Sequence, residues 1–242
     1  MPEKSVSVLL IDLGNTRLKW QLRSAGSVLQ QGVGDYDDRL TEKLPEADKV
    51  LIAAVRAHPE SRRLLEQKYP EKVCWLNEPL DDDSLIRHCY SDPSRLGVDR
   101  WLAMLGARLH SSGNLLVVDA GTALTADLLT DDNRHQGGFI VPGLALSAQA
   151  LFHNTERVHA YPDEKNQEGT EPGSNTLACV VQGVRRQLQS FVVSLQTDYP
   201  QYRLLVTGGD GRWLCDRLNL TYYPDLVFDG MDSLCAGSFL PW

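Results

Sequence analysis

Residues 7–22 read SVLLIDLGNTRLKWQL, and residues 114–129 read NLLVVDAGTALTADLL. In each stretch a run rich in Leu, Ile and Val reaches Asp-x-Gly, passes through a polar turn and continues with alternating apolar residues, which predicts two strands joined by a tight hairpin. Asp12 matches Asp119, and Gly14 matches Gly121. Chance likeness of two short strands is the alternative, but the shared Asp-x-Gly favours two homologous lobes.

The rest of the chain alternates helix and strand patterns, which predicts an α/β fold. With 242 residues, the chain has room for two lobes of ordinary size. We place the N-terminal lobe at residues 1–112 and the C-terminal lobe at 113–242. Helices are expected at 59–69, 99–110 and 176–195, a short helix from Gly143 through Phe152, strands at 203–207 and 226–228, and a short helix from Arg212.

The composition of the chain limits its possible binding partners and its possible location in the cell. The formal net charge is −8, and no basic stripe is present, which argues against nucleic acid binding. No stretch approaches the roughly 20 apolar residues of a membrane helix, and the N-terminus does not resemble a signal peptide. The five cysteines are widely spaced and are expected to be reduced, mostly buried thiols in the cytoplasm.

The first hairpin carries Asp12-Leu13-Gly14-Asn15-Thr16, with Lys19 beyond it. Gly14 allows the backbone to approach a ligand closely, while the side chains of Asn15 and Thr16 offer donors to phosphate oxygens. A carboxylate repels phosphate, so Asp12 would instead hold a hydrated Mg²⁺ that bridges the phosphates. An ordinary hairpin turn explains this short sequence equally well when it is taken alone.

Two later segments extend this pattern. Residues 119–123 (DAGTA) repeat the hairpin design, and two such hairpins could hold a triphosphate from both sides. Residues 207–210 (TGGD) lie between a predicted strand and a predicted helix, where their glycines could admit adenine and ribose. A Gly-Gly pair by itself indicates only a loop.

Taken in this order, the three segments resemble the superfamily of sugar kinases, actin and heat-shock chaperone ATPases. Residues 90–100 (YSDPSRLGVDR) further resemble the Y-x-x-P-x-x-L-G-x-D-R segment of type III pantothenate kinases, and residues 137–143 (GGFIVPG) resemble their G-G-x-I-x-P-G segment. Together with the two Asp-x-Gly hairpins, four motifs occur in family order across nearly the whole chain. The resemblance implies two duplicated ribonuclease-H-like lobes around a nucleotide cleft.

The resemblance also implies an activity and a set of site residues. The activity is ATP-dependent phosphorylation of pantothenate, the first step of coenzyme A biosynthesis, by a homodimer that needs Mg²⁺ and a monovalent cation, K⁺ or NH₄⁺. Asp99 is implied as the proton acceptor, and Asp119 as the ligand of the monovalent cation. The implied ATP contacts are Asp12, Leu13, Gly14, Asn15, Thr16, Arg17, Leu18, Lys19 and Thr122, and the implied pantothenate contacts are Tyr90, Gly97, Val98, Asp99, Arg100 and Thr176.

Plainer interpretations remain open for several of these residues. Asp99 and Arg100 could be a helix-start acid and a neighbouring surface charge, although an anionic substrate needs a fixed cation and Arg100 could supply one. Thr176 could be an ordinary helix N-cap. For the whole chain, the alternatives are a non-catalytic nucleotide-binding regulator, or a sugar or acetate kinase of the same superfamily.

Overall fold

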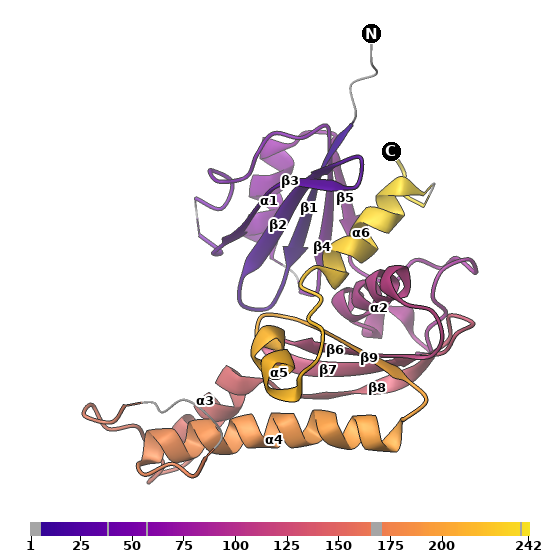
Figure 1. The fold of residues 1–242 in the computed structure, drawn as a ribbon. Helices are drawn as coiled ribbons and strands as arrows, with labels where there is room; N and C mark the ends of the chain where they lie inside the picture. Colours follow the sequence, from indigo (N-terminus) through magenta and orange to yellow (C-terminus); the bar gives the residue numbers. More distant parts are fainter. Residues whose placement is uncertain (1–5, 38, 57, 166–170, 238) are drawn as a thin grey trace. The chain divides into compact units, whose positions relative to one another are not determined.

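The structure is a computed structural model that describes residues 6–37, 39–56, 58–165, 171–237 and 239–242. The chain forms two compact units. Unit 1 contains residues 1–112, 132–137 and 225–242, and unit 2 contains residues 113–131 and 138–224. Each unit has its own sheet and helices, labelled in Figure 1, and mixed α/β structure is confirmed in both.

The sheet of unit 1 has five strands in the order β3-β2-β1-β4-β5. β1 and β2 form the predicted first hairpin, in which Asp12 lies opposite Lys19. β4 and β5 then run parallel to β1 and to each other. The strands are β1 (Ser7–Leu13), β2 (Leu18–Ser24), β3 (Ser27–Gly34), β4 (Lys49–Ala54) and β5 (Val73–Leu76).

Apolar side chains alternate along these strands and form a hydrophobic core on one face of the sheet. Leu9, Ile11 and Leu13 on β1 pack in one cluster with residues of β2, β4 and the helix α1 (Pro59–Lys68). Pro59 begins the helix, as predicted, because proline at the first helical position loses no hydrogen bond. Leu65 faces the sheet and is fully buried.

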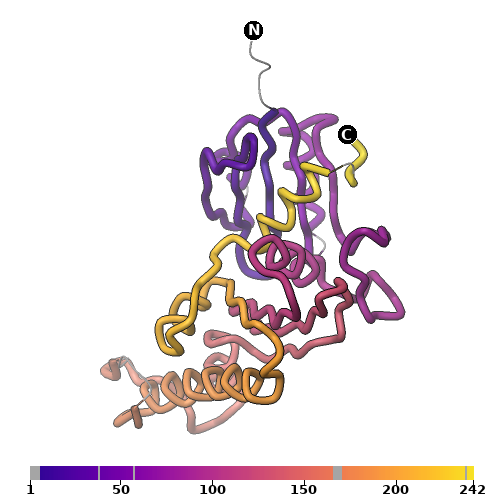
Figure 2. Tube along the Cα trace, turned by 45° about the vertical axis from the view of Figure 1, so that its right-hand side comes forward, coloured from indigo at the N-terminus to yellow at the C-terminus, as the bar shows by residue number. Residues whose placement is uncertain are grey.

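The other face of this sheet is covered by α2 (Val98–His110) and α6 (Leu226–Ala236), which lie side by side in Figures 1 and 2. A Cβ added to Gly106 would overlap the backbone of Leu226, and one added to Gly230 would overlap the backbone of Leu102. The two glycines therefore allow the helix backbones to touch.

The strand predicted at residues 226–228 is wrong, because these residues begin α6. A run of three apolar residues fits a strand or a buried helix equally well. Burial of Leu226, Met231 and Leu234 against α2 decides for the helix. The boundary drawn at 112/113 coincides with the end of the first segment of unit 1, but residues 225–242 pack in unit 1.

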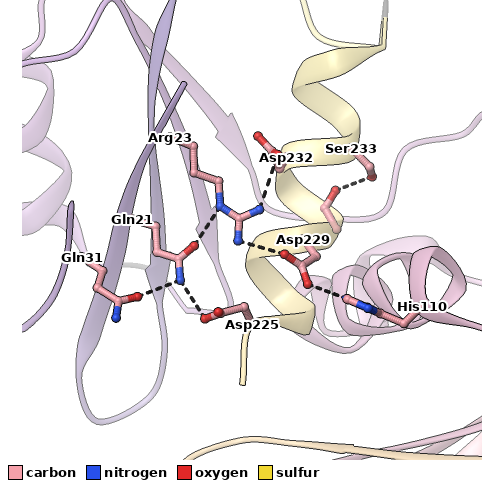
Figure 3. A network of polar contacts seen from close by, with 9 residues as sticks. Gln21, Arg23, Gln31, His110, Asp225, Asp229, Asp232 and Ser233 are labelled. Carbon is pink, nitrogen blue, oxygen red and sulfur yellow. Dashed lines mark hydrogen bonds and ion pairs between the residues drawn. The ribbon is translucent and has the colours of Figure 1, made fainter. Parts of the chain in front are cut away.

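A polar network ties α6 to β2 and α2 (Figure 3). Arg23, which is 5% exposed, donates to Asp229 at 2.9 Å and to Asp232 at 3.4 Å. Asp229 also pairs with His110 at 2.8 Å, and Gln21 donates to Asp225 at 2.7 Å. The N-cap residue Asp225 and the first two turns of α6 are thus held by side chains of other elements, which fits its place in unit 1.

Unit 2 is built on a four-stranded sheet in the order β8-β7-β6-β9. β6 and β7 form the predicted second hairpin, and β9 runs parallel to β6. Val184, Leu188 and Leu195 pack against one face of the sheet, as the predicted apolar stripe requires. The elements are β6 (Leu115–Ala120), β7 (Ala123–Leu129), β8 (His135–Pro142), β9 (Arg203–Thr207), α3 (Leu144–Asn154), α4 (Thr176–Asp198) and α5 (Gly211–Leu218).

All five cysteines are free thiols. The expectation that they are mostly buried is wrong, because Cys89 and Cys179 are exposed and Cys215 alone of the five is buried. None of the helices in the described part of the chain combines the length and apolar character that crossing a bilayer requires.

Candidate active site

The first hairpin presents its polar residues at the carboxyl end of β1. Asp12 is half-buried near the end of the strand, whereas Asn15, Thr16 and Lys19 are exposed. Asp12 and Lys19 are direct cross-strand partners, so their side chains leave the same face of the sheet. A carboxylate and an ammonium group therefore stand beside an exposed polar turn, an arrangement suited to a metal-bound phosphate.

The segment that leads into α2 brings four predicted substrate residues together. Asp99 lies in the first helical turn, where its Oδ1 accepts the Arg100 backbone N–H at 2.8 Å. A Cβ on Gly97 would lie 2.5 Å from the same Oδ1. Gly97 therefore has to be glycine if the Asp99 carboxylate is to remain in this position. Val98 is buried in the core.

Arg100 is 6% exposed, and its Nη1 donates to the Tyr90 hydroxyl at 3.0 Å. A guanidinium carries five N–H donors, and burying its charge is costly unless these donors are paired. The interpretation of Arg100 as a surface charge is therefore wrong. Asp99, Arg100 and Tyr90 form one cluster within unit 1.

Two neighbours of Tyr90 were not identified from the sequence. His135, which is 2% exposed, lies parallel to the Tyr90 ring at 6.2 Å between centroids and 9° between planes. Cys89 Sγ lies 3.9 Å from His135 Nδ1. His135 N donates to Arg87 O at 2.9 Å and Arg87 N donates to Asn133 O at 3.0 Å, which joins these segments. No local sequence signal reveals a pairing of this kind.

In unit 2, three segments meet at the second hairpin. A Cβ on Gly208, whose φ is +91°, would overlap Asp119 Oδ1 and the carbonyl oxygen of Ala120. Asp210 N donates to that carbonyl at 2.8 Å, so the predicted adenosine segment lies directly on the hairpin. Gly143 N donates to Thr122 O at 2.9 Å and places the start of α3 on the same turn.

Thr176 is the first residue of α4 and lies apart from these hairpin contacts. Asn175 is the N-cap, since its Oδ1 accepts from Ala178 N at 2.7 Å, so the N-cap interpretation of Thr176 is wrong. Thr176 lines an open pocket of about 650 Å³ together with residues of α3 and α4. The pocket contains none of the other predicted site residues.

Glu164 caps the N-terminal end of α4, and it too was not identified from the sequence. Its carboxylate accepts the backbone N–H groups of Thr176 at 3.0 Å and Leu177 at 2.9 Å. Desolvation acts to raise the pKa of Glu164, but the backbone donors of Leu177, Thr176 and Tyr161, together with the charge of His159, lower the pKa below its ordinary value. Glu164 lies in the polar segment 161–175 that precedes α4, of which residues 166–170 lie outside the described residues.

Sequence comparisons agree with the motifs. The sequence model of the type III pantothenate kinase family matches residues 8–197. A type III pantothenate kinase of Pseudomonas fluorescens strain Pf0-1 is 34% identical over 247 residues, covering 94% of this chain and 98% of its own. One of Marinobacter nauticus is 32% identical over 247 residues, covering 96% and 100%.

Solved structures share the fold. A Campylobacter jejuni protein described as a Baf family transcriptional activator superposes with a TM-score of 0.63 at 23% identity, covering 94% of this chain and 97% of its own. A Sinorhizobium meliloti protein described as a 2-dehydro-3-deoxygalactonokinase gives 0.59 at 12% identity, covering 93% and 97%. The chain thus shares its fold with both of these proteins. By sequence, the chain belongs to the type III pantothenate kinase family.

Proposed function

We propose that this chain transfers the γ-phosphoryl group of ATP to the primary hydroxyl of pantothenate, the first step of coenzyme A biosynthesis, with Asp99 as the general base. Family membership supports the reaction and its two substrates. The observation that carries the assignment of the base is the Asp99 carboxylate held at the start of α2 beside buried Arg100. The five free cysteines fit our placement of the enzyme in the cytoplasm.

Among the carboxylates of the motifs, Asp99 is the one to which no phosphate-binding or metal-binding role is assigned. Asp12 and Asp119 lie on the two hairpins, whereas Asp99 lies with Tyr90 and Arg100. As the pantothenate oxygen attacks the γ-phosphorus, its proton passes to the Asp99 carboxylate and ADP leaves. Arg100 would bind the substrate carboxylate as a planar, permanently charged donor.

Phosphate binding is assigned to the hairpins. Residues 12–19 would form the first ATP contact, and Thr122 the second. Asp12 would hold the kinase's divalent metal, proposed to be Mg²⁺, through the water shell of the ion. The charge of the metal would neutralise the negative charge that develops on the phosphates. This role fits a single half-buried carboxylate, because Mg²⁺ usually binds through one or two carboxylates, water and the nucleotide.

Asp119 is proposed to hold the monovalent cation, K⁺ or NH₄⁺. Its Oδ1 and the carbonyl oxygen of Ala120 both lie beside Gly208, where a Cβ would fill the space. Oxygen donors of this kind replace the hydration shell of K⁺ in proteins. The residues present therefore fit the cation, which would add positive charge near the phosphates.

Activity should consequently depend on the cation. We expect wild-type turnover to fall sharply when Na⁺ or Tris replaces K⁺ and to recover when K⁺ or NH₄⁺ is added, with coupled ADP release as the readout. Asp119→Asn should need far more K⁺ for half-maximal activity, because it loses the ligand charge. Equal wild-type activity with and without K⁺ would remove this role from Asp119.

The chain is also proposed to form a symmetric homodimer through unit 2. In the described structure α3 has no buried residue, although it is rich in Leu and Ala. Leu146, Leu151 and the β8 residue Ile140 are each at least 40% exposed. Exposed apolar surface of this kind commonly marks a subunit interface, and a second copy offers the same surface.

Sedimentation should therefore give about twice the chain mass of 27.0 kDa. Leu151→Glu, which places a charge in the proposed interface, should shift the protein toward monomer, whereas Leu109→Glu, an exposed leucine of unit 1, should not. A fully active wild-type monomer would contradict the proposal.

An acceptor panel tests the proposed reaction against its alternatives. Purified protein with ATP, divalent metal and K⁺ should release ADP with pantothenate and give only background with N-acetyl sugars or acetate. Phosphorylation of a sugar or acetate instead would assign a different kinase. Nucleotide binding without turnover on any acceptor would favour a non-catalytic regulator.

A further inference from the structure

A tyrosine and a histidine support the first hairpin from outside the family motifs. The Tyr36 hydroxyl donates to the carbonyl oxygen of Gly14 at 2.6 Å. The Tyr36 ring lies on the His58 ring at 4.2 Å between centroids and 15° between planes. All three residues belong to unit 1. Neither side chain is assigned any role in the reaction above.

The hydrogen bond controls a peptide that would face ATP. The Gly14 carbonyl and the Asn15 N–H belong to one planar trans peptide, so they point in opposite directions. A donor that fixes the carbonyl therefore fixes the direction of the Asn15 N–H, which is left on the side away from Tyr36. Without that donor, glycine gives the peptide wide freedom to rotate.

We infer that Tyr36 is a positioning residue for ATP, which holds the Gly14–Asn15 peptide with its N–H directed at a phosphate oxygen, and that His58 holds the Tyr36 ring in place. Successive backbone N–H groups directed at phosphate are a recurring way for proteins to bind this group. The inference rests on the proposed role of residues 12–19 in ATP binding. It adds Tyr36, which lies 22 residues away from Gly14 along the chain, as a residue that holds the hairpin in place.

Charge and burial fit this role. Burial, followed by the nearby Asp12 carboxylate, raises the pKa of Tyr36 to about 12. The hydroxyl therefore stays protonated, and able to donate, at every pH near neutrality. Burial and then Arg56 lower the pKa of His58, which favours the neutral ring. His58 Nε2 is buried without a hydrogen-bond partner among the described residues, so the ring acts through its face.

The test uses Tyr36→Phe, which removes only the hydroxyl. We expect KM for ATP to rise about 5- to 10-fold, the usual value of one hydrogen bond, with kcat and KM for pantothenate within about twofold of wild type. Tyr69→Phe is the matched control, because Tyr69 also donates to a backbone carbonyl, that of Pro45 at 2.7 Å. Its KM for ATP should match wild type.

A second pair of variants tests the support. His58→Phe keeps a flat ring under Tyr36 and should retain a KM for ATP close to wild type. His58→Ala removes the ring and should behave like Tyr36→Phe. Loss of ATP affinity in His58→Phe as large as in His58→Ala would contradict the stacking role.

Asn15→Pro, which removes the backbone N–H itself, and Lys19→Ala separate the inference from the assignment of the hairpin. If these variants fold and leave KM for ATP unchanged, the hairpin does not bind ATP and both claims fail. If they raise it while Tyr36→Phe does not, the role of Tyr36 alone is overturned. Equal effects of Tyr36→Phe and Tyr69→Phe on thermal stability and on KM for ATP would likewise reduce Tyr36 to a structural residue.

Discussion

Asp99→Asn should lower kcat at least about 100-fold while leaving KM for ATP nearly unchanged, because a positioned general base contributes about 10²–10⁴-fold to such steps. The substitution is conservative for the fold. Asparagine keeps an Oδ1 that can accept the Arg100 backbone N–H, the contact made by Asp99 at 2.8 Å. Steady-state kinetics with pantothenate and ATP varied in turn would measure both parameters.

Asp92→Asn is the matched control for this variant. Asp92 lies in the same segment, where it caps the short helix η1 (Pro93–Arg95) and pairs with Arg95 at 3.0 Å. Its carboxylate is proposed to have no role in proton transfer, so turnover should stay close to wild type. Near wild-type turnover of Asp99→Asn, or outright loss of ATP binding, would show that Asp99 is a structural residue.

Arg100→Ala should raise KM for pantothenate about 100-fold with a smaller effect on KM for ATP. Removing one partner of a buried charged pair costs about 2–5 kcal/mol, and Arg100 is proposed to bind the substrate carboxylate. Arg100→Lys keeps the charge but loses the planar pair of donors, so an intermediate KM is expected.

The control for this prediction is Arg95→Ala. Arg95 lies five residues earlier on an exposed turn and pairs with Asp92, so its loss should leave both KM values unchanged. Thermal unfolding of each variant separates a lost substrate contact from a lost fold. An unchanged KM for pantothenate in a folded Arg100→Ala protein would contradict the proposed contact.

The sequence predicted those elements whose pattern is local and regular. Both hairpins were identified because a period-two apolar run meets Asp-x-Gly twice, and their registers place Asp12 opposite Lys19 and Asp119 opposite Thr125. The long helix α4 was identified because its apolar stripe continues over several turns. Such patterns can be recognised from the local sequence alone, without knowledge of the tertiary contacts.

The C-terminal segment could not be predicted in the same way. Its three apolar residues at 226–228 suit either kind of element, and the choice depends on contact with α2. That contact requires glycine at positions 106 and 230, which are far apart in the sequence. Burial against α2 thus determines that residues 226–228 form a helix, a choice that local propensity did not determine.

The supports of the site were missed for a related reason. Tyr36, His135 and Glu164 each act on a residue that lies 12 to 45 positions away in the chain, through one hydrogen bond or ring contact. A single sequence carries no periodic signal for such a contact. The motif residues themselves were predicted from their order along the chain and from the resemblance to the type III pantothenate kinase family.

The reaction is tested most directly by ³¹P NMR of the purified protein with ATP, divalent metal, K⁺ and pantothenate. A phosphomonoester resonance should grow in step with ADP, one for each ATP consumed, and the product should be pantothenate carrying one phosphate. The Asp99→Asn protein should give the same signal at least about 100-fold more slowly. ADP that forms without the phosphomonoester, or no ADP from the folded wild-type protein, would contradict the account.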